Sequence, residues 1–308
     1  MQSFGEKNYS NTIEKGQRES YDGFLNISKN ILSFLIYNSL FISLVCVFLT
    51  YVSFEVLNVQ PNTILLFAVF LSTFSVYSLN RLTDLEEDSV NVPGRESYVK
   101  GKEKSLLALC IISYGVALLL GFLVNPVTVL VLLFPLGIGI LYSLEVSPKL
   151  PRLKNIPGMK NFSVTLSWAA GAAFIPVVFS YPGLWITFLL FYFVFVKFLV
   201  NTISFDVRDI EGDKKSGVRT IPVLLGRSRT KLLLFGIQST LIFWMLIVIS
   251  EGIFTRYWLL FTLSIVYGFW YIRYFSENRK RGTFSRDLLI DGEWMILAFL
   301  CFIISTFS

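Results

Sequence analysis

Nine stretches of this chain are candidates to cross a lipid bilayer, and this feature restricts the fold more than any other. A membrane-spanning helix needs about 20 mostly apolar residues. Eight stretches meet that need, and the ninth is charge-free only in its second half. The nine are 31–54, 62–79, 106–124, 126–144, 162–181, 184–205, 232–250, 257–272 and 288–307. With 54% hydrophobic residues and a mean hydropathy of +0.63, the chain is predicted to be an all-α membrane protein.

The basic residues predict an orientation for the bundle. Cytoplasmic loops keep Lys and Arg, whereas translocated loops are poor in them. If all nine stretches span the membrane, 25 of the 27 basic residues lie on one face, and only Lys197 and Arg256 lie elsewhere. We therefore expect an integral, multi-pass protein of the cell membrane, with the N-terminus and the basic loops in the cytoplasm.

Composition excludes several classes of site. The chain has no histidine, so histidine metal ligands and imidazole bases are excluded. Its three cysteines stand alone in apolar stretches and indicate small core residues without disulfides. The net charge of +6 follows from the loop bias and favours attraction to anionic lipid or substrate over nucleic acid. Residues 1–30 are polar and predict a cytoplasmic arm without a cleaved signal peptide, and residues 31–308 predict a single transmembrane domain.

Two clusters of acidic residues follow even-numbered spans. The first is Asn80, Asp84 and Asp88, and the second is Asp206, Asp209 and Asp213. Steps of three and four residues place side chains on one face of a helix. Carboxylates stacked in this way near a low-dielectric boundary are costly unless cations compensate them. Oxygen ligands without histidine or nearby cysteine favour magnesium over zinc.

One such cluster alone is equally typical of a solvated helix end whose acids balance neighbouring Lys and Arg. Two clusters 125 residues apart on the same predicted face argue against that interpretation. They predict a parallel repeat with halves at about 31–145 and 162–275, followed by a ninth helix at about 287–307. Basic residues accompany both clusters, which indicates a strongly anionic ligand such as a pyrophosphate. The adjoining apolar walls suit a hydrocarbon attached to it.

These residues resemble the UbiA superfamily of intramembrane prenyltransferases over most of the chain. The resemblance rests on the first cluster with its downstream "NVPGR", on "LYS" at 141–143 with the basic stretch that follows, and on "DVRDIEGDKKSGVRTIPVLLG". Arg81 stands after Asn80 where the family usually has Asp, and Glu96 follows Arg95 where Pro is usual, which leaves the choice of acceptor open. The resemblance implies nine transmembrane helices around a central cavity, capped on the cytoplasmic side by the two Asp-rich motifs.

The resemblance also implies the reaction. A prenyl group would pass from an isoprenoid diphosphate, geranyl or longer, to a lipophilic and usually aromatic acceptor through an allylic carbocation. Two Mg²⁺ ions would bridge the diphosphate. The implied principal metal ligands are Asp84, Asp88, Asp209 and Asp213, with Asn80 and Asp206 as further ligands or orienting groups. Tyr142 is the candidate to stabilise the carbocation with its ring.

Further side chains are candidates for binding substrate. They are Arg95, Lys149, Arg152, Lys154, Lys160, Asn161, Lys197 and Arg208. The basic ones are also explained by the loop bias, and Asn161, like Asn201, is typical of an interhelical hydrogen bond as well. An ammonium group inside a span must face a cavity, pair with an acid or reach the interface, and we expect Lys197 to face the cavity. Asp287 and Asp291 either line the cavity or pair with Arg286.

The main alternative is a multi-span secondary transporter with a cytoplasmic-side ion site, which also uses repeats and intramembrane charge. A phospholipid head-group transferase would need a compact D-x-x-D-G-x-x-A-R pattern, which is missing. A non-catalytic scaffold would have no reason to keep both acidic clusters. Hydroxybenzoate, naphthoate, glycerol-phosphate lipid and tetrapyrrole acceptors all stay open, and no obligatory protein partner is predicted.

Overall fold

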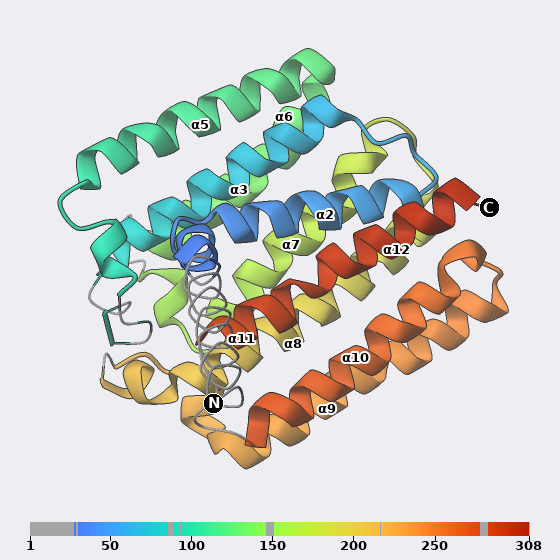
Figure 1. Cartoon of the computed structure of the whole chain (residues 1–308). Coiled ribbons are helices and arrows are strands. Elements are labelled where there is room, and N and C mark those ends of the chain that lie inside the picture. Colours follow the sequence, from blue (N-terminus) through green and yellow to red (C-terminus); the bar gives the residue numbers. More distant parts are fainter. Residues whose placement is uncertain are drawn as a thin grey trace, which may run out of the picture.

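Long helices that lie alongside one another make up the protein (Figure 1). The computed structural model describes residues 28, 30–85, 89–90, 92, 94–145, 151–215, 217–277 and 283–307. The regular elements in this part of the chain are all helical, which confirms the all-α prediction. The long helices are α2 (Leu40–Val56), α3 (Thr63–Thr83), α5 (Glu103–Val124), α6 (Pro126–Ser143), α7 (Met159–Val177), α8 (Leu184–Lys215), α9 (Ile221–Ser250), α10 (Trp258–Glu277) and α12 (Glu293–Phe307).

Short elements join them. These are η1 (Glu96–Tyr98), η2 (Leu153–Asn155), η3 (Thr255–Tyr257), α11 (Thr283–Arg286) and the single π-helical turn η4 (Asp287–Asp291). Six helical segments of the described residues are long and apolar enough to cross a membrane: α3, α5, α6, α8, α9 and the continuous Asp287–Phe307. The chain is therefore a multi-pass membrane protein. Helices α7 and α10 are not among these segments, so nine membrane crossings stay a prediction.

The first predicted span is not one straight helix. Segments Asn30–Tyr37 and Leu40–Val56 meet at an angle of 73°, and they add a seventh candidate span if they are counted together. Ser39 between them has a left-handed φ of 63°, which interrupts the helical ladder because L-residues rarely continue a helix there. Residues 30–37 therefore leave the axis of α2 and lie against the end of α3, where the Arg81 guanidinium donates to the Ile36 carbonyl at 2.6 Å.

Local sequence signals set the starts of two helices. The Asn62 side chain accepts a hydrogen bond from the Leu65 amide at 3.0 Å and caps α3, and Asn125 does the same for α6, directly before Pro126. Both are favoured N-terminal arrangements. Helices α3 and α6 approach closely at Gly139 and Val76. A Cβ at position 139 would lie only 2.9 Å from the Val76 side chain, so glycine permits the contact. This contact brings the ends of both helices to the same point.

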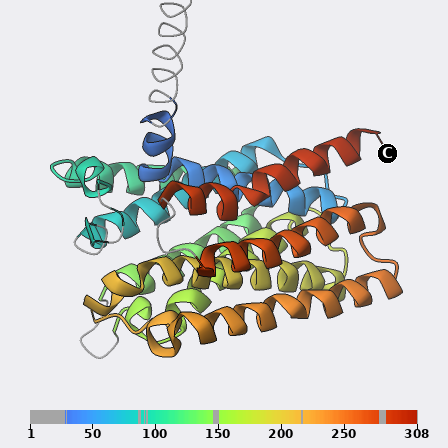
Figure 2. The same cartoon turned by 60° about the horizontal axis from the view of Figure 1, so that its bottom comes forward.

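The helices close around a central space. Helix α3 packs against α2, α5 and α6, while α7 packs against α6 and α8. The C-terminal helix α12 packs against α2 (Figure 2), so the two ends of the described chain complete the ring. Helices α9 and α10 pair with each other outside α8. The bundle thus has α2, α3, α6, α7 and α8 as its inner wall.

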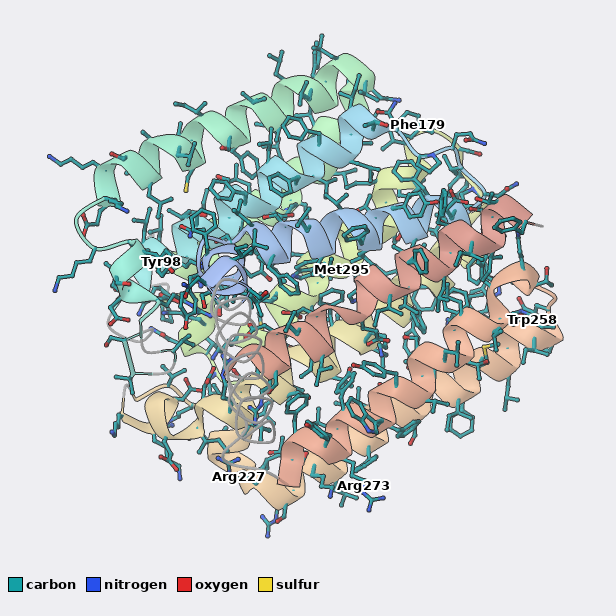
Figure 3. All side chains as sticks on the ribbon, in the orientation of Figure 1. Tyr98, Phe179, Arg227, Trp258, Arg273 and Met295 are labelled. Carbon is teal, nitrogen blue, oxygen red and sulfur yellow. The ribbon has the colours of Figure 1, made fainter. Side chains whose placement is uncertain are left out.

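Charged and apolar loops lie at opposite ends of the bundle. Figure 3 shows Arg227 and Arg273 at the end that also carries Tyr98, whereas Phe179 and Trp258 lie at the other end. The end with Arg227 and Arg273 is here called the basic end. Its position agrees with the loop bias in the sequence, which predicts that it faces the cytoplasm.

Cysteine labelling in intact cells tests this orientation. Ser180 and Ser228 are both exposed and lie next to Phe179 and Arg227 at opposite ends. In Ser180→Cys, an impermeant maleimide added outside should label the new thiol, and in Ser228→Cys it should label only after the membrane is opened. The wild-type chain, with Cys110 and Cys301 buried and Cys46 partly buried, is the control. External labelling of Ser228→Cys in sealed cells would reverse the topology.

Candidate active site

A cavity of about 340 Å³ opens between the inner helices near the basic end. Its walls come from α2, α3, α6, α7, α8 and η4. Carboxylates, amides and guanidinium groups line one end, and aliphatic and small residues such as Thr50, Val69 and Ile175 line the other. A single space therefore connects a polar region to an apolar one.

One residue of the first motif and two of the second line the polar end. Asn80 on α3 and Asp206 and Asp209 on α8 all line the cavity. Helix α3 continues past Leu79 to Thr83, as the spacing of the first motif predicts, and Asp84 is the residue directly after it. Asn80 Oδ1 accepts a hydrogen bond from Ser143 Oγ at 3.2 Å. Asp88 and Lys149 lie outside the described residues.

Lysines from one short segment hold acids of both motifs. Lys160 Nζ at the start of α7 lies 2.8 Å from Asp206 and 3.8 Å from Asp213, and Lys154 Nζ in η2 lies 2.5 Å from Asp84. Burial lowers the pKa of Lys160, but the Asp206 carboxylate, the Tyr142 phenol and the Asp213 carboxylate raise it by more, so the net shift is upward. Lys160 is therefore an ammonium ion at neutral pH.

Arginines surround the same end of the cavity. The Arg208 guanidinium binds Asp209 through two hydrogen bonds of 2.6 and 3.0 Å, and its Nη1 lies 4.0 Å from Asp287 Oδ2. Arg95 lies over the Tyr37 ring with its Cζ 6.0 Å from the ring centroid. Arg95 and Arg208 both line the cavity. Arg152 lies behind them, 3.9 Å from Asp84.

The oxygen atoms of this region fit a hard divalent cation. Asn161 donates to Asp206 at 2.7 Å, which leaves Asn161 Oδ1 buried without a hydrogen bond in the described structure. Asp213 Oδ2 is likewise buried and accepts no hydrogen bond there, with Lys160 3.8 Å away. Amide and carboxylate oxygens with unused acceptor capacity are what Mg²⁺ binds. Among the described residues no three acids form a metal-binding group, and the acids pair with lysines and an arginine.

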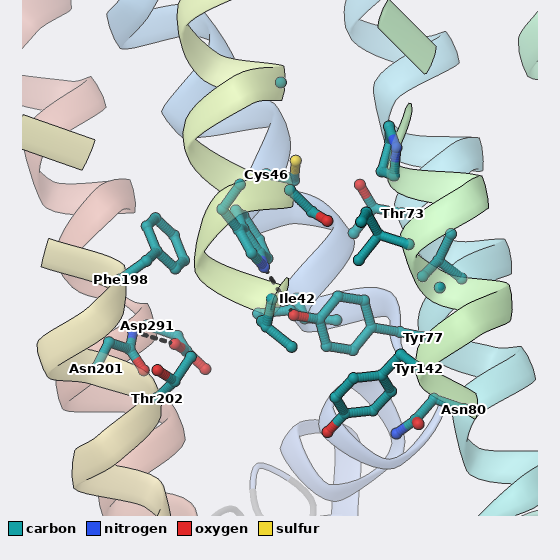
Figure 4. A pocket seen from close by; sticks show the side chains of 18 of the residues that line it. Ile42, Cys46, Thr73, Tyr77, Asn80, Tyr142, Phe198, Asn201, Thr202 and Asp291 are labelled. Carbon is teal, nitrogen blue, oxygen red and sulfur yellow. Dashed lines mark hydrogen bonds between the residues drawn. The ribbon is translucent and has the colours of Figure 1, made fainter. Parts of the chain in front are cut away.

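Aromatic rings line the middle of the cavity. Trp168 Nε1 donates to the Tyr77 hydroxyl at 2.8 Å, and Trp168 stacks on Phe198 with ring centroids 4.3 Å apart. Tyr142 lies beside Tyr77 on the same side of the cavity, as Figure 4 shows. Tyr142 is also close enough to Lys160 to interact with it electrostatically. Tyr142 thus lines the cavity close to Lys160, and its role towards a carbocation stays a prediction.

A pair of polar side chains lies on the wall opposite Tyr77 and Tyr142. Asn201 Nδ2 on α8 donates to Asp291 Oδ1 in η4 at 2.7 Å, and both line the cavity (Figure 4). Asp287 lines it as well. The sequence allowed Asp287 and Asp291 either to line the cavity or to pair with Arg286, and in the structure both line the cavity.

Lys197 does not occupy the position expected from the sequence. It is 2% exposed and lies outside the cavity lining. Its Nζ pairs with Glu293 at 2.8 Å and donates to the Ser264 carbonyl at 2.9 Å. An ammonium buried in a span needs an acid partner, and α12 supplies one. The expectation that Lys197 faces the cavity is therefore wrong.

Several lining residues were missed in the sequence. Tyr77 precedes Asn80 by three positions and Trp168 follows Asn161 by seven, so both share a helix face with a residue already selected. Ser143 is the third letter of the "LYS" motif. The helix-face spacing therefore indicated these residues. However, the chain has 30 Phe, 14 Tyr and 6 Trp, so the sequence alone does not separate cavity-lining rings from rings that pack between helices.

Comparison with known proteins identifies relatives. The model of the UbiA prenyltransferase family matches residues 39–303. Digeranylgeranylglyceryl phosphate synthase of Methanococcoides burtonii is 35% identical over 171 residues, which are 54% of this chain and 58% of that protein. The protein of the same name from Pyrococcus abyssi is 25% identical over 191 residues, 60% of this chain and 64% of that one. The match thus spans less than two thirds of these relatives.

Solved structures share the fold. A UbiA homologue from Archaeoglobus fulgidus bound to GPP and Mg²⁺ superimposes with a TM-score of 0.67 at 20% identity, covering 88% of this chain and 98% of that one. The apo UbiA homologue from Aeropyrum pernix K1 gives a TM-score of 0.68 at 15% identity, covering 86% and 98%. At these identities the likeness concerns the fold.

Removal of the Lys160 ammonium tests the charge balance of the site. Lys160→Met leaves Asp206 buried without its ion-pair partner, which typically costs about 3–5 kcal/mol. We expect a lower Tm in detergent than for Lys104→Met, whose side chain is exposed. Magnesium chloride should raise the Tm of Lys160→Met more than that of the wild type, because the ion can take over the compensation. Equal Tm values for the two lysine variants would contradict this account.

Proposed function

Because this chain belongs to the UbiA prenyltransferase family, we propose that it transfers an isoprenoid chain from a prenyl diphosphate to a lipophilic acceptor within the membrane. One observation supports this most strongly. The cavity joins a polar end, lined by both acidic motifs, to an apolar interior. A ligand with an anionic head and a hydrocarbon chain fits such a space.

The polar end would hold the diphosphate. Lys160, Arg95 and Arg208 line it and can donate hydrogen bonds to phosphate oxygens. Lys154 and Arg152 lie behind them and orient Asp84. We expect the basic groups to fix the head while the chain extends towards Val69 and Ile175. Lys149, outside the described residues, stays a further candidate.

Magnesium is the metal that we propose for the oxygen ligands of the two motifs. The proposed ligands are Asn80, Asp84, Asp88, Asp206, Asp209 and Asp213, with two ions implied by the family resemblance. When bound, the ions neutralise the charge that develops on the diphosphate as its bond to carbon breaks. Asn161 would orient Asp206 through the hydrogen bond already present.

The aromatic section of the cavity would receive the cationic chain. Tyr142 and Tyr77 present ring faces next to the polar end, and Trp168 and Phe198 continue the surface. An allylic carbocation is stabilised by such faces and is protected from water by the surrounding helices. The hydrogen bond from Trp168 fixes the ring of Tyr77.

The acceptor is the least constrained part of the proposal. The sequence favours an aromatic compound through the family tendency. The names of the relatives instead describe a product with two geranylgeranyl groups on one glyceryl phosphate. We propose a lipid alcohol carrying phosphate as the acceptor, and an aromatic acceptor is the alternative.

Substitution of the acids tests the site. Asp84→Asn and Asp213→Asn should each lower prenyl transfer by about 100-fold or more, the usual cost of one electrostatic stabiliser. Glu211→Gln is the matched control, since Glu211 lies on α8 between Asp209 and Asp213 but is exposed. Transfer of radiolabel from geranylgeranyl diphosphate into lipid-extractable product is the measurement. Wild-type rates in both Asp variants would remove the proposed site.

Metal and acceptor dependence provide a second test. Purified protein should transfer the label to geranylgeranylglyceryl phosphate in the presence of magnesium, and EDTA should abolish transfer until magnesium is restored. 4-Hydroxybenzoate, offered in parallel, should be a poor acceptor. Preference for 4-hydroxybenzoate would favour the aromatic alternative. Substrate uptake into proteoliposomes without diphosphate release would instead support a transporter.

A further inference from the structure

The polar pair formed by Asn201 and Asp291 lies apart from the acidic motifs, on the wall of the cavity opposite Tyr77 and Tyr142 (Figure 4). Resting on the proposed prenyl transfer, we propose that Asp291 receives the proton of the acceptor hydroxyl and that Asn201 positions the Asp291 carboxylate. The acceptor class is then an alcohol, and the bond formed is an ether.

The backbone at this point is specialised. Asp291 ends the single π-helical turn η4, and α12 follows after Gly292. A side chain at Gly292 would collide with the Leu288 carbonyl oxygen, so the turn requires glycine there. Single π-helical turns inside helices are frequent at functional sites. In this protein the turn carries Asp287 and Asp291 to the cavity.

The two acids of the turn are compensated differently. Asp287 lies 4.0 Å from Arg208 and within electrostatic range of Arg95 and Arg81, so it resembles the ion-paired acids of the motifs. Asp291 instead accepts a hydrogen bond from the neutral amide of Asn201. Among the described residues no ion pair of 4.0 Å or less joins Asp291 to a Lys or Arg, and Arg208 acts on it only from a longer distance. A hydrogen bond from a neutral amide stabilises a carboxylate less than a bound cation does, so the carboxylate held by the amide remains the better proton acceptor.

Asp291 also lies on the same section of the cavity as the proposed reacting carbon. The Tyr77 hydroxyl is close enough to interact electrostatically with both Asp291 and Tyr142. An acceptor hydroxyl that attacks the carbon beside Tyr142 must enter this section, where Asp291 supplies a hydrogen-bond acceptor. With the diphosphate at the polar end, the acceptor approaches from the wall of α8 and η4.

The proton of the acceptor hydroxyl has to pass to a base, and Asp291 is the base that we assign to it. The bond between the prenyl carbon and the diphosphate oxygen breaks, and its electron pair leaves with the diphosphate. The acceptor oxygen uses a lone pair to bond to that carbon, and its proton passes to Asp291. Asp291 becomes a carboxylic acid and releases the proton to water when the product leaves. No oxidant or reductant is involved.

Asp291→Asn is the direct test, because asparagine keeps an oxygen for the Asn201 amide but cannot take a proton. With geranylgeranyl diphosphate and geranylgeranylglyceryl phosphate as probes, we expect kcat to fall about 100-fold or more, the usual contribution of a general base. The KM for the donor should not change. Asp291→Glu should retain more activity than Asp291→Asn, and Glu211→Gln should match the wild type.

A more acidic acceptor separates proton transfer from a structural role. An acceptor analogue with fluorine next to the reacting hydroxyl needs less help in losing its proton. The kcat of Asp291→Asn, relative to the wild type, should therefore fall less with the fluorinated acceptor than with geranylgeranylglyceryl phosphate. Equal impairment with both, or a kcat within about threefold of the wild type, would overturn the role of Asp291.

Prenyl transfer to an alcohol and the role of Asp291 are tested separately by these measurements. If the wild type transfers no prenyl group to any alcohol, the proposed function or its acceptor is wrong. If the wild type transfers normally and Asp291→Asn does too, only the inference about Asp291 is wrong. Should Asp291→Asn not fold, Asn201→Ala replaces it and should lower kcat about tenfold while donor KM is kept. Unchanged kcat in Asn201→Ala would contradict the positioning role.

Discussion

The structure depends on the cost of burying carboxylates at the edge of a membrane. Acids of two motifs lie at less than a tenth of full exposure, and each is matched by a cation from elsewhere in the chain. Lys160 at the start of α7 forms ion pairs with Asp206 and Asp213 on α8, and Lys154 forms one with Asp84. An isolated buried charge would cost several kcal/mol. These ion pairs therefore join α3 and α8 to residues 154–160, and the polar end of the cavity lies beside them.

Much of this arrangement could be predicted from the sequence. Apolar length and the basic loops indicate a multi-pass helical bundle, and steps of three and four residues place each acidic motif on a helix face. The structure confirms the helices and brings Asn80 and Asp206 to one cavity. The repeat of two halves stays a prediction, as does the assignment of metal ligands, because it rests on spacing and family resemblance.

The remaining features depend on contacts between distant segments. Hydropathy cannot detect the break at Ser39, since the residues on both sides of it are apolar and only the backbone angle changes. Lys197 is the same kind of case, because its partner Glu293 lies 96 positions away on another helix. The π-helical turn that carries Asp291 to the cavity needs glycine at position 292, where a side chain would collide with the Leu288 carbonyl oxygen. Periodicity carries no information on any of these.

The central claim is that the two motifs act on one anionic head group. A double-mutant cycle between the motifs tests it most directly, with Asn80→Ala and Asp209→Asn, alone and combined, and magnesium-dependent binding of geranyl thiolodiphosphate measured by calorimetry. If both side chains serve one ligand, the combined loss of binding energy should differ from the sum of the single losses by about 1 kcal/mol or more. Losses that add within about 0.3 kcal/mol would show two independent sites and contradict the account.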